Sequence, residues 1–119
     1  MSGQTSINLD IPGWMSKEEL AWLHWQAILS ESVVEIGSWM GRSTYAILTG
    51  CSGFVTAVDH FKGSPDELET NHREAKTEDI KQAFMANVGT FPNLQVLPVD
   101  SIIASESFED LYIDMVFID

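Results

Sequence analysis

Four apolar stretches of this sequence each carry an acidic residue at or near their end. These stretches cover about residues 32–37, 53–59, 93–100 and 113–119, and their acidic residues are Glu35, Asp59, Asp100 and Asp119. With 18 acidic residues in 119, random placement would rarely produce this coincidence. If the stretches are parallel strands, their carboxyl ends meet at one edge of a sheet, where ligands bind in such folds. The pattern therefore predicts a ligand site lined by carboxylates.

Two glycines follow the first of these acidic residues. Gly37 and Gly41 lie two and six residues after Glu35 and would let the backbone turn sharply beside a ligand. Asp59 lies 24 residues after Glu35, close to the spacing of about 20 at which a carboxylate binds ribose hydroxyls in nucleotide-binding sheets. The turn lacks the G-x-G-x-x-G pattern that places a pyrophosphate on a helix N-terminus. Glu35 instead favours a ligand that carries a cation or donates hydrogen bonds.

A helix is expected before the first strand, over residues 16–29. Ser16 and Glu19 form a capping box at its start. One apolar face would pack on the sheet; it consists of Leu20, Leu23, Ala27 and Ile28. A second apolar face carries Trp22, Trp25 and Leu29. We interpret this second face as additional core, with a cover for a ligand or partner as the alternative.

The remaining elements alternate between strand and helix. Helices are expected over 41–50, from Thr77 to Val88, and within 101–112, and a long polar segment over 60–76 has the length of a lid or binding loop. This alternation predicts an α/β fold, a Rossmann-like parallel sheet with helices on both faces. We expect one domain over 1–119, with 1–31 as a helical cover and 32–119 as the sheet.

The composition excludes several classes of function. Six basic against eighteen acidic residues give a net charge of −12, which disfavours nucleic acid and anionic membranes as partners. The sequence has neither a secretory signal nor an apolar run of about 18 residues, so we expect a cytoplasmic protein. Cys51 is the only cysteine and is expected to be a packed core residue. His24 is expected to be a partly buried structural residue. The isolated histidines offer no zinc-binding spacing.

The stretch "VVEIGSWMGRST" resembles the first motif of the class I S-adenosylmethionine-dependent methyltransferases, E/D-x-G-x-x-x-G-x-S. The segments "IPGWMSKEEL", "AVDHFKGSP" and "DMVFID" are similar to a subgroup of small-molecule O-methyltransferases, of the catechol and sugar-tailoring types. The resemblance implies a seven-stranded sheet whose first four strands are ordered 3-2-1-4. On this comparison the chain is C-terminally truncated, because it ends after the fourth strand.

The resemblance also implies a role for each candidate residue. The methionine part of S-adenosylmethionine would lie against the turn and the start of the next helix, with Glu35 just behind; these residues are Gly37, Ser38, Trp39, Gly41 and Ser43. Asp59 would bind the ribose, His60 or Phe61 would flank the adenine, and Asp100 and Ser101 would contact its edge. Asp119 would face the methyl-transfer centre, where metal-dependent relatives use the matching aspartate to bind magnesium.

Simpler roles remain open for several of these residues. The glycines could merely end a strand, Asp59 could be a turn residue, Asp100 a helix N-cap and Asp119 a solvated terminal carboxylate.

The expected function is S-adenosylmethionine-dependent O-methylation of a small molecule, with segment 60–76 and the tryptophan-rich helix as the substrate cover. A nucleotide- or NAD-binding enzyme of the same topology and a non-catalytic interaction module are the alternatives. We also expect a homo-oligomer that forms through the apolar fourth strand, because an open strand edge invites pairing.

Overall fold

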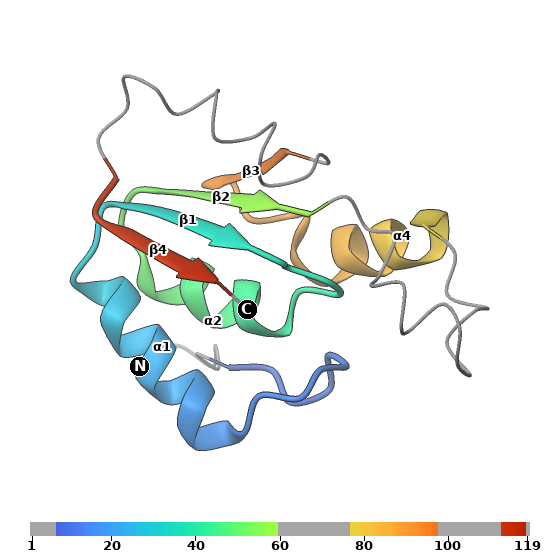
Figure 1. The fold of residues 1–119 in the computed structure, drawn as a ribbon, viewed down its shortest axis with the longest axis horizontal. Coiled ribbons are helices and arrows are strands. Elements are labelled where there is room, and N and C mark those ends of the chain that lie inside the picture. The colour runs from blue at the N-terminus through green and yellow to red at the C-terminus, as the bar shows by residue number, and fades with distance from the viewer. Residues whose placement is uncertain (1–6, 60–76, 98–112, 119) are drawn as a thin grey trace.

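The computed structural model describes residues 7–59, 77–97 and 113–118 of the chain. Its centre is a parallel sheet of four strands in the order β3-β2-β1-β4 (Figure 1). The strands are β1 (Ser32–Ile36), β2 (Phe54–Val58), β3 (Leu94–Leu97) and β4 (Met115–Ile118). The α/β class that the sequence pattern predicts and the strand order 3-2-1-4 that the resemblance implies are both confirmed.

The carboxyl ends of the strands are aligned at one edge of this sheet. Ile36 of β1 is in register with Val58 of β2 on one side and with Ile118 of β4 on the other. Val58 in turn pairs with Leu97 of β3. The residues that follow the strands therefore start from the same edge, as the sequence pattern predicts.

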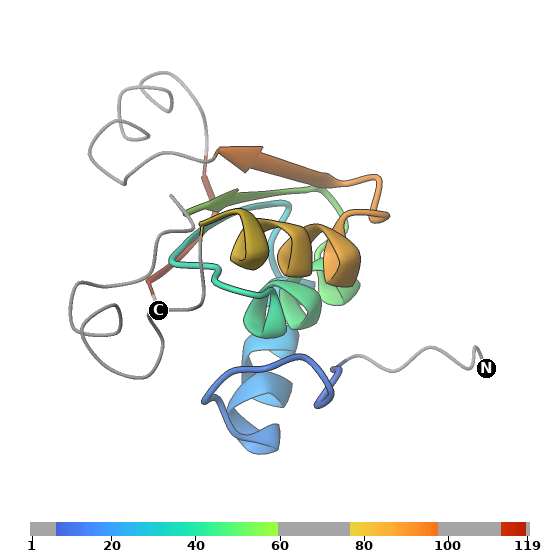
Figure 2. The same cartoon turned by 90° about the vertical axis from the view of Figure 1, so that its right-hand side faces the viewer.

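In the described part of the chain, three helices lie on one face of the sheet. They are α1 (Lys17–Ile28), α2 (Arg42–Gly50) and α4 (Thr77–Val88), and Figure 2 shows α2 and α4 against the sheet with α1 beneath α2. The core on this face is apolar and combines residues from all three helices and two strands: Leu23, Ala27, Val33, Ile47, Leu48, Cys51, Val55, Ala57, Ile80, Phe84 and Val88. This packing keeps α2 against the carboxyl end of β1.

Helix α1 matches its predicted position but differs in which residues it buries. Leu20, Leu23 and Ala27 are buried as predicted, whereas Ile28 is largely exposed, so its predicted place in the core is wrong. The second apolar face is not core either; Trp22 and Trp25 are each 60% exposed and Leu29 is 70% exposed. The interpretation of that face as additional core is therefore wrong, and a cover for a ligand or partner stays a prediction.

The predicted capping box starts α1. The Glu19 N–H donates to Ser16 Oγ (3.1 Å), and the Ser16 N–H donates to Glu19 Oε1 (2.7 Å). Two groups of Ser16 lower the pKa of the Glu19 carboxyl, because both stabilise the carboxylate. The backbone N–H has the larger effect and the hydroxyl the smaller one.

The second face of the sheet carries a smaller apolar cluster. Val34 and Val58 are buried there, and Ile36, Leu97 and Ile113 pack against them. The helix expected within 101–112 and the long segment 60–76 lie outside the described residues. No helix in the described part of the chain is both long enough and apolar enough to cross a membrane.

His24 and Cys51 both have the packing roles expected of them. His24 is partly buried, and its Nδ1 lies 2.9 Å from the Ala46 carbonyl oxygen, which joins α1 to α2. Cys51 directly follows α2, is buried, and donates to the Ser30 carbonyl oxygen at 3.3 Å. Burial raises the pKa of its thiol, so the neutral, unreactive form is favoured.

Candidate functional site

Glu35 is a fully buried carboxylate at the carboxyl end of β1. The hydroxyls of Ser43 and Thr44, both in the first turn of α2, donate to its two oxygens. A buried charge needs such donors, because an unpaired carboxylate would lose its hydration without compensation. Glu35 therefore fixes the start of α2 behind the glycine turn, and Ser43 has a structural contact. The expected place of Glu35 behind a cofactor stays a prediction.

The turn between β1 and α2 needs its two glycines. Gly37 has φ 89° and Gly41 has φ 99°, both in the left-handed region that disfavours side chains. A Cβ on Gly41 would also lie 3.3 Å from Val88 Cγ1 of α4. The predicted tight turn is thus present, and at Gly41 the need for glycine is both conformational and steric.

Trp39 stands in the middle of this turn with φ 48°, an uncommon conformation for a bulky side chain. The backbone N–H of Trp39 donates to Asp59 Oδ2 at 2.7 Å. Asp59 follows β2, where its own N–H donates to the Leu97 carbonyl oxygen at 3.2 Å, so its backbone is anchored to β3. The structure therefore brings together the turn and the carboxylate that the sequence predicts to act with it.

Ser38 has a buried hydroxyl without a hydrogen-bond partner among the described residues. It borders a small hollow of about 10 Å³, room for roughly one water molecule, together with Trp39 and Ser43. A buried hydroxyl normally has a partner, so this atom fits a turn that completes its hydrogen bonds with a ligand or an ordered water. The turn, the orphaned hydroxyl and the anchored Asp59 are compatible with the S-adenosylmethionine site that the resemblance implies.

Arg42 is a residue of this site that the sequence analysis missed. Its guanidinium donates to three carbonyl oxygens of the N-terminal segment, those of Leu9 (2.9 Å), Ile11 (2.8 Å) and Met15 (3.0 Å). These bonds hold the segment before α1 against the start of α2. The only signal in the sequence was the position of Arg42 directly after Gly41.

Trp14 is a second residue that was missed. Its ring stacks on that of Trp39, with 5.2 Å between the ring centroids and 30° between their planes. Trp14 belongs to the segment that Arg42 fastens. The glycine turn is consequently flanked by this N-terminal segment as well as by β2.

The other predicted site residues lie outside the described part of the chain: His60, Phe61, Asp100, Ser101 and Asp119. Their expected contacts with adenine, and that of Asp119 with magnesium, remain predictions. Within residues 7–59, 77–97 and 113–118, no three His, Cys, Asp or Glu side chains are grouped so that they could hold a metal ion.

Comparison with known proteins identifies the fold. No protein-family model matches the chain, and no curated protein matches it. Among solved structures, cofactor-bound Rv0187 from MTB superposes with a TM-score of 0.60 and 23% identity over 92% of this chain and 47% of its own. A "putative O-methyltransferase" from Klebsiella pneumoniae superposes with a TM-score of 0.60 and 16% identity over 92% of this chain and 46% of its own.

Two facts follow from these superpositions. The chain has an O-methyltransferase-like fold. It spans about half the length of each of these two proteins.

Proposed function

We propose that this chain binds S-adenosylmethionine and belongs to an enzyme that methylates a hydroxyl group of a small molecule. The observation that carries the proposal is the turn from Gly37 to Gly41. This turn follows the buried Glu35, and the backbone N–H of Trp39 within it donates to Asp59. It stands at the carboxyl edge of a sheet whose strands are ordered 3-2-1-4. The O-methyltransferase-like fold and the cofactor-bound state of Rv0187 support the same assignment.

S-adenosylmethionine supplies a methyl group activated on a sulfonium. This methyl group would be available for transfer to a hydroxyl oxygen of the acceptor, with the thioether as the leaving group and the hydroxyl proton released to solvent. The contribution of the protein is chiefly to align the reacting atoms. Ser38 and the backbone of the turn would hold the methionine part, and Asp59 would orient the ribose.

The same geometry disfavours the nicotinamide alternative. A dinucleotide places its pyrophosphate at a helix N-terminus, where the partial positive charge attracts anions. Here the first turn of α2 already faces the buried Glu35 carboxylate through Ser43 and Thr44. A pyrophosphate at this position would lie next to a second anion, whereas the sulfonium and ammonium groups of S-adenosylmethionine would be attracted to it.

Calorimetric titration with S-adenosylhomocysteine tests the proposal, with NADH as the control ligand. We expect micromolar binding of S-adenosylhomocysteine and none of NADH. Asp59→Ala should weaken binding by about tenfold or more, since hydrogen bonds to a charged group contribute about 1.5–3 kcal/mol. Glu31→Ala, which removes an exposed carboxylate just before β1, at the opposite edge of the sheet from the turn, should leave the affinity unchanged.

Circular dichroism of each variant shows whether it is folded. A folded chain that binds NADH would overturn the proposal in favour of the nucleotide-binding alternative. A folded chain that binds neither ligand would favour the non-catalytic interaction module.

A further inference from the structure

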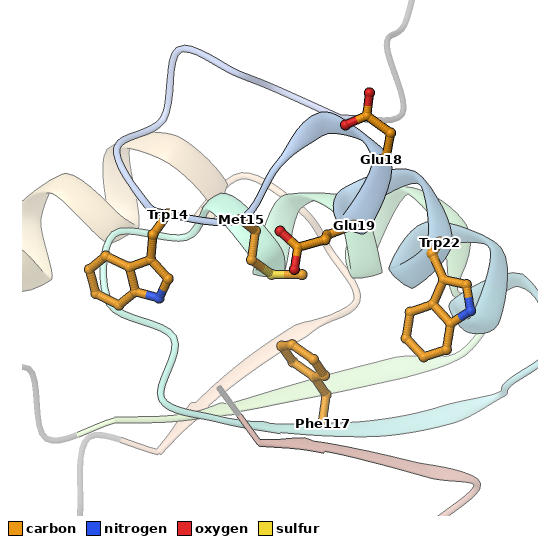
Figure 3. A pocket seen from close by; sticks show the side chains of 6 residues that line it. All are labelled: Trp14, Met15, Glu18, Glu19, Trp22 and Phe117. Carbon is orange, nitrogen blue, oxygen red and sulfur yellow. The ribbon is translucent and has the colours of Figure 1, made fainter.

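A large open cavity lies between α1, the segment before it, and β4. Its volume is about 500 Å³, within the range of small-molecule sites. Six residues line it: Trp14, Met15, Glu18, Glu19, Trp22 and Phe117. Figure 3 shows Trp14 and Trp22 on opposite sides, with Phe117 rising from β4 between them. Trp22, one residue of the exposed apolar face of α1, thus forms part of the wall of a cavity.

This cavity adjoins the glycine turn. Trp14, one of its walls, stacks on Trp39 of the turn, and Trp14 and Met15 also border the hollow beside Ser38. On the other side, Phe117 is in register with Glu35 at the carboxyl end of the sheet. A molecule in the cavity would therefore lie next to the proposed binding site of the methyl donor.

The cavity walls combine aromatic rings with negative charge. Among the described residues, two carboxylates and no basic side chain line it. In Figure 3 the Glu19 carboxylate turns toward the space between the tryptophans, whereas that of Glu18 points away from Phe117. The bonds from Ser16 lower the pKa of Glu19, so it is ionised at neutral pH. The guanidinium of Arg42, nearby in the fold, already donates to three carbonyl oxygens.

Aromatic faces and a carboxylate together are suited to an organic cation. A ring attracts a cation through its quadrupole, and a carboxylate adds a Coulombic attraction. The same walls disfavour an anion, because its charge would meet Glu19 without a counter-ion. The apolar part of a ligand would fill the space between the rings, and its ammonium group would lie toward Glu19.

We propose that this cavity holds the methyl acceptor, and that the acceptor is an amine, with an ammonium group attached to an aromatic or apolar body that bears the hydroxyl. The inference rests on the proposed methyltransferase function for the identity of the reaction. The charge preference of the cavity stands on its own walls and can be tested without the methyl donor.

Three phenols that differ mainly in charge test this preference. Tyramine carries an ammonium group, 4-ethylphenol has a similar body without it, and 3-(4-hydroxyphenyl)propanoate carries a carboxylate. Binding to the full chain is measured by calorimetry at low ionic strength, where screening is weak. We expect tyramine to bind about five- to tenfold more tightly than 4-ethylphenol, and the propanoate to bind most weakly.

Glu19→Gln shows whether the cavity is responsible. A glutamine at this position can still accept the Ser16 N–H bond, so the capping box is kept while the charge is removed. The preference for tyramine over 4-ethylphenol should fall by about threefold. Glu31→Gln, which removes one exposed charge beyond the other end of α1 and outside the cavity, should leave the preference unchanged.

The two proposals fail in different ways. Equal affinities for tyramine and 4-ethylphenol, or equal effects of Glu19→Gln and Glu31→Gln, would overturn the amine assignment even if S-adenosylhomocysteine binds. If tyramine binds with the expected preference but S-adenosylhomocysteine does not bind, the proposed function fails, and with it the role of the cavity as an acceptor site. Retained tyramine preference in a Trp22→Ala, Phe117→Leu double variant that remains folded would place the cation elsewhere and also overturn the inference.

Discussion

Glu35 is the residue on which the geometry of the site depends most. Its carboxylate is completely buried, and its observed donors include the hydroxyls of Ser43 and Thr44. The sequence predicted an acidic residue behind the turn but not that two hydroxyls of the next helix would satisfy it. The donors convert a costly buried charge into a connection between β1 and α2.

Removing one donor should therefore destabilise the fold. We expect Ser43→Ala to lower the free energy of unfolding by about 1–3 kcal/mol, because part of the Glu35 carboxylate is left without its bond. Urea denaturation followed by circular dichroism measures the change. Ser52→Ala, at an exposed position beyond the end of α2, should change it by less than about 0.5 kcal/mol. Equal effects of the two substitutions would mean that the Ser43 bond contributes little.

Among the elements, helix α1 contributes both to the core and to the cavity. Leu23 and Ala27 are buried in the core, whereas Glu18, Glu19 and Trp22 line the cavity. The capping box fixes where the helix begins and thereby where Glu19 lies. Glu19 has a lower pKa in the folded chain than in the unfolded chain, so its stabilising contribution is present above the ordinary pKa of 4.5. That contribution disappears as the pH falls through the lower, folded-state pKa.

The Ser16 hydroxyl is part of the cause of that lowered pKa, so its removal should have a pH-dependent cost. We expect Ser16→Ala to lower the free energy of unfolding by about 0.5–2 kcal/mol near pH 7. The cost should shrink as the pH is lowered from 7 through the lowered pKa of Glu19, because the carboxylate is then protonated. Urea unfolding of the natural chain and the variant over this range gives the difference. A cost that grows on acidification would contradict the linkage.

At the scale of the whole molecule, β4 forms one edge of the described sheet, and β3 forms the other. Val116 and Ile118 of β4 are 53% and 71% exposed. An apolar strand at an edge favours pairing with another chain. We therefore propose self-association through β4 and the surface next to it.

Sedimentation at high micromolar concentration tests the association. We expect a dimer or larger assembly that Ile118→Lys shifts toward the monomer, because charged residues on an edge strand oppose pairing. Gln95→Lys adds the same charge to an exposed position on β3 and should have a smaller effect. A monodisperse monomer of the natural chain would contradict the proposal.

The sequence predicted the parts of this molecule that depend on periodic patterns. Short apolar strands that alternate with helices specify a parallel sheet, and the acidic residues near their ends indicated Glu35 and Asp59. The exposure of Trp22 was not predictable in this way, because α1 is apolar on two sides and periodicity cannot say which side is covered. The bonds from Arg42 were also beyond reach, because they end on backbone carbonyl oxygens whose position depends on the path of the chain.

The contact between β1 and β4 has a consequence for the order of folding. Ser32 and Asp114, which bond to each other beside these strands, are 82 residues apart. Closing a loop of that length costs about 4 kcal/mol of chain entropy beyond a constant term. Strand β2 meets β1 over a much shorter connection. The sheet should thus assemble from β1 and β2 outward, with β4 docking late, and the amide hydrogens of β4 should exchange with solvent before those of β1.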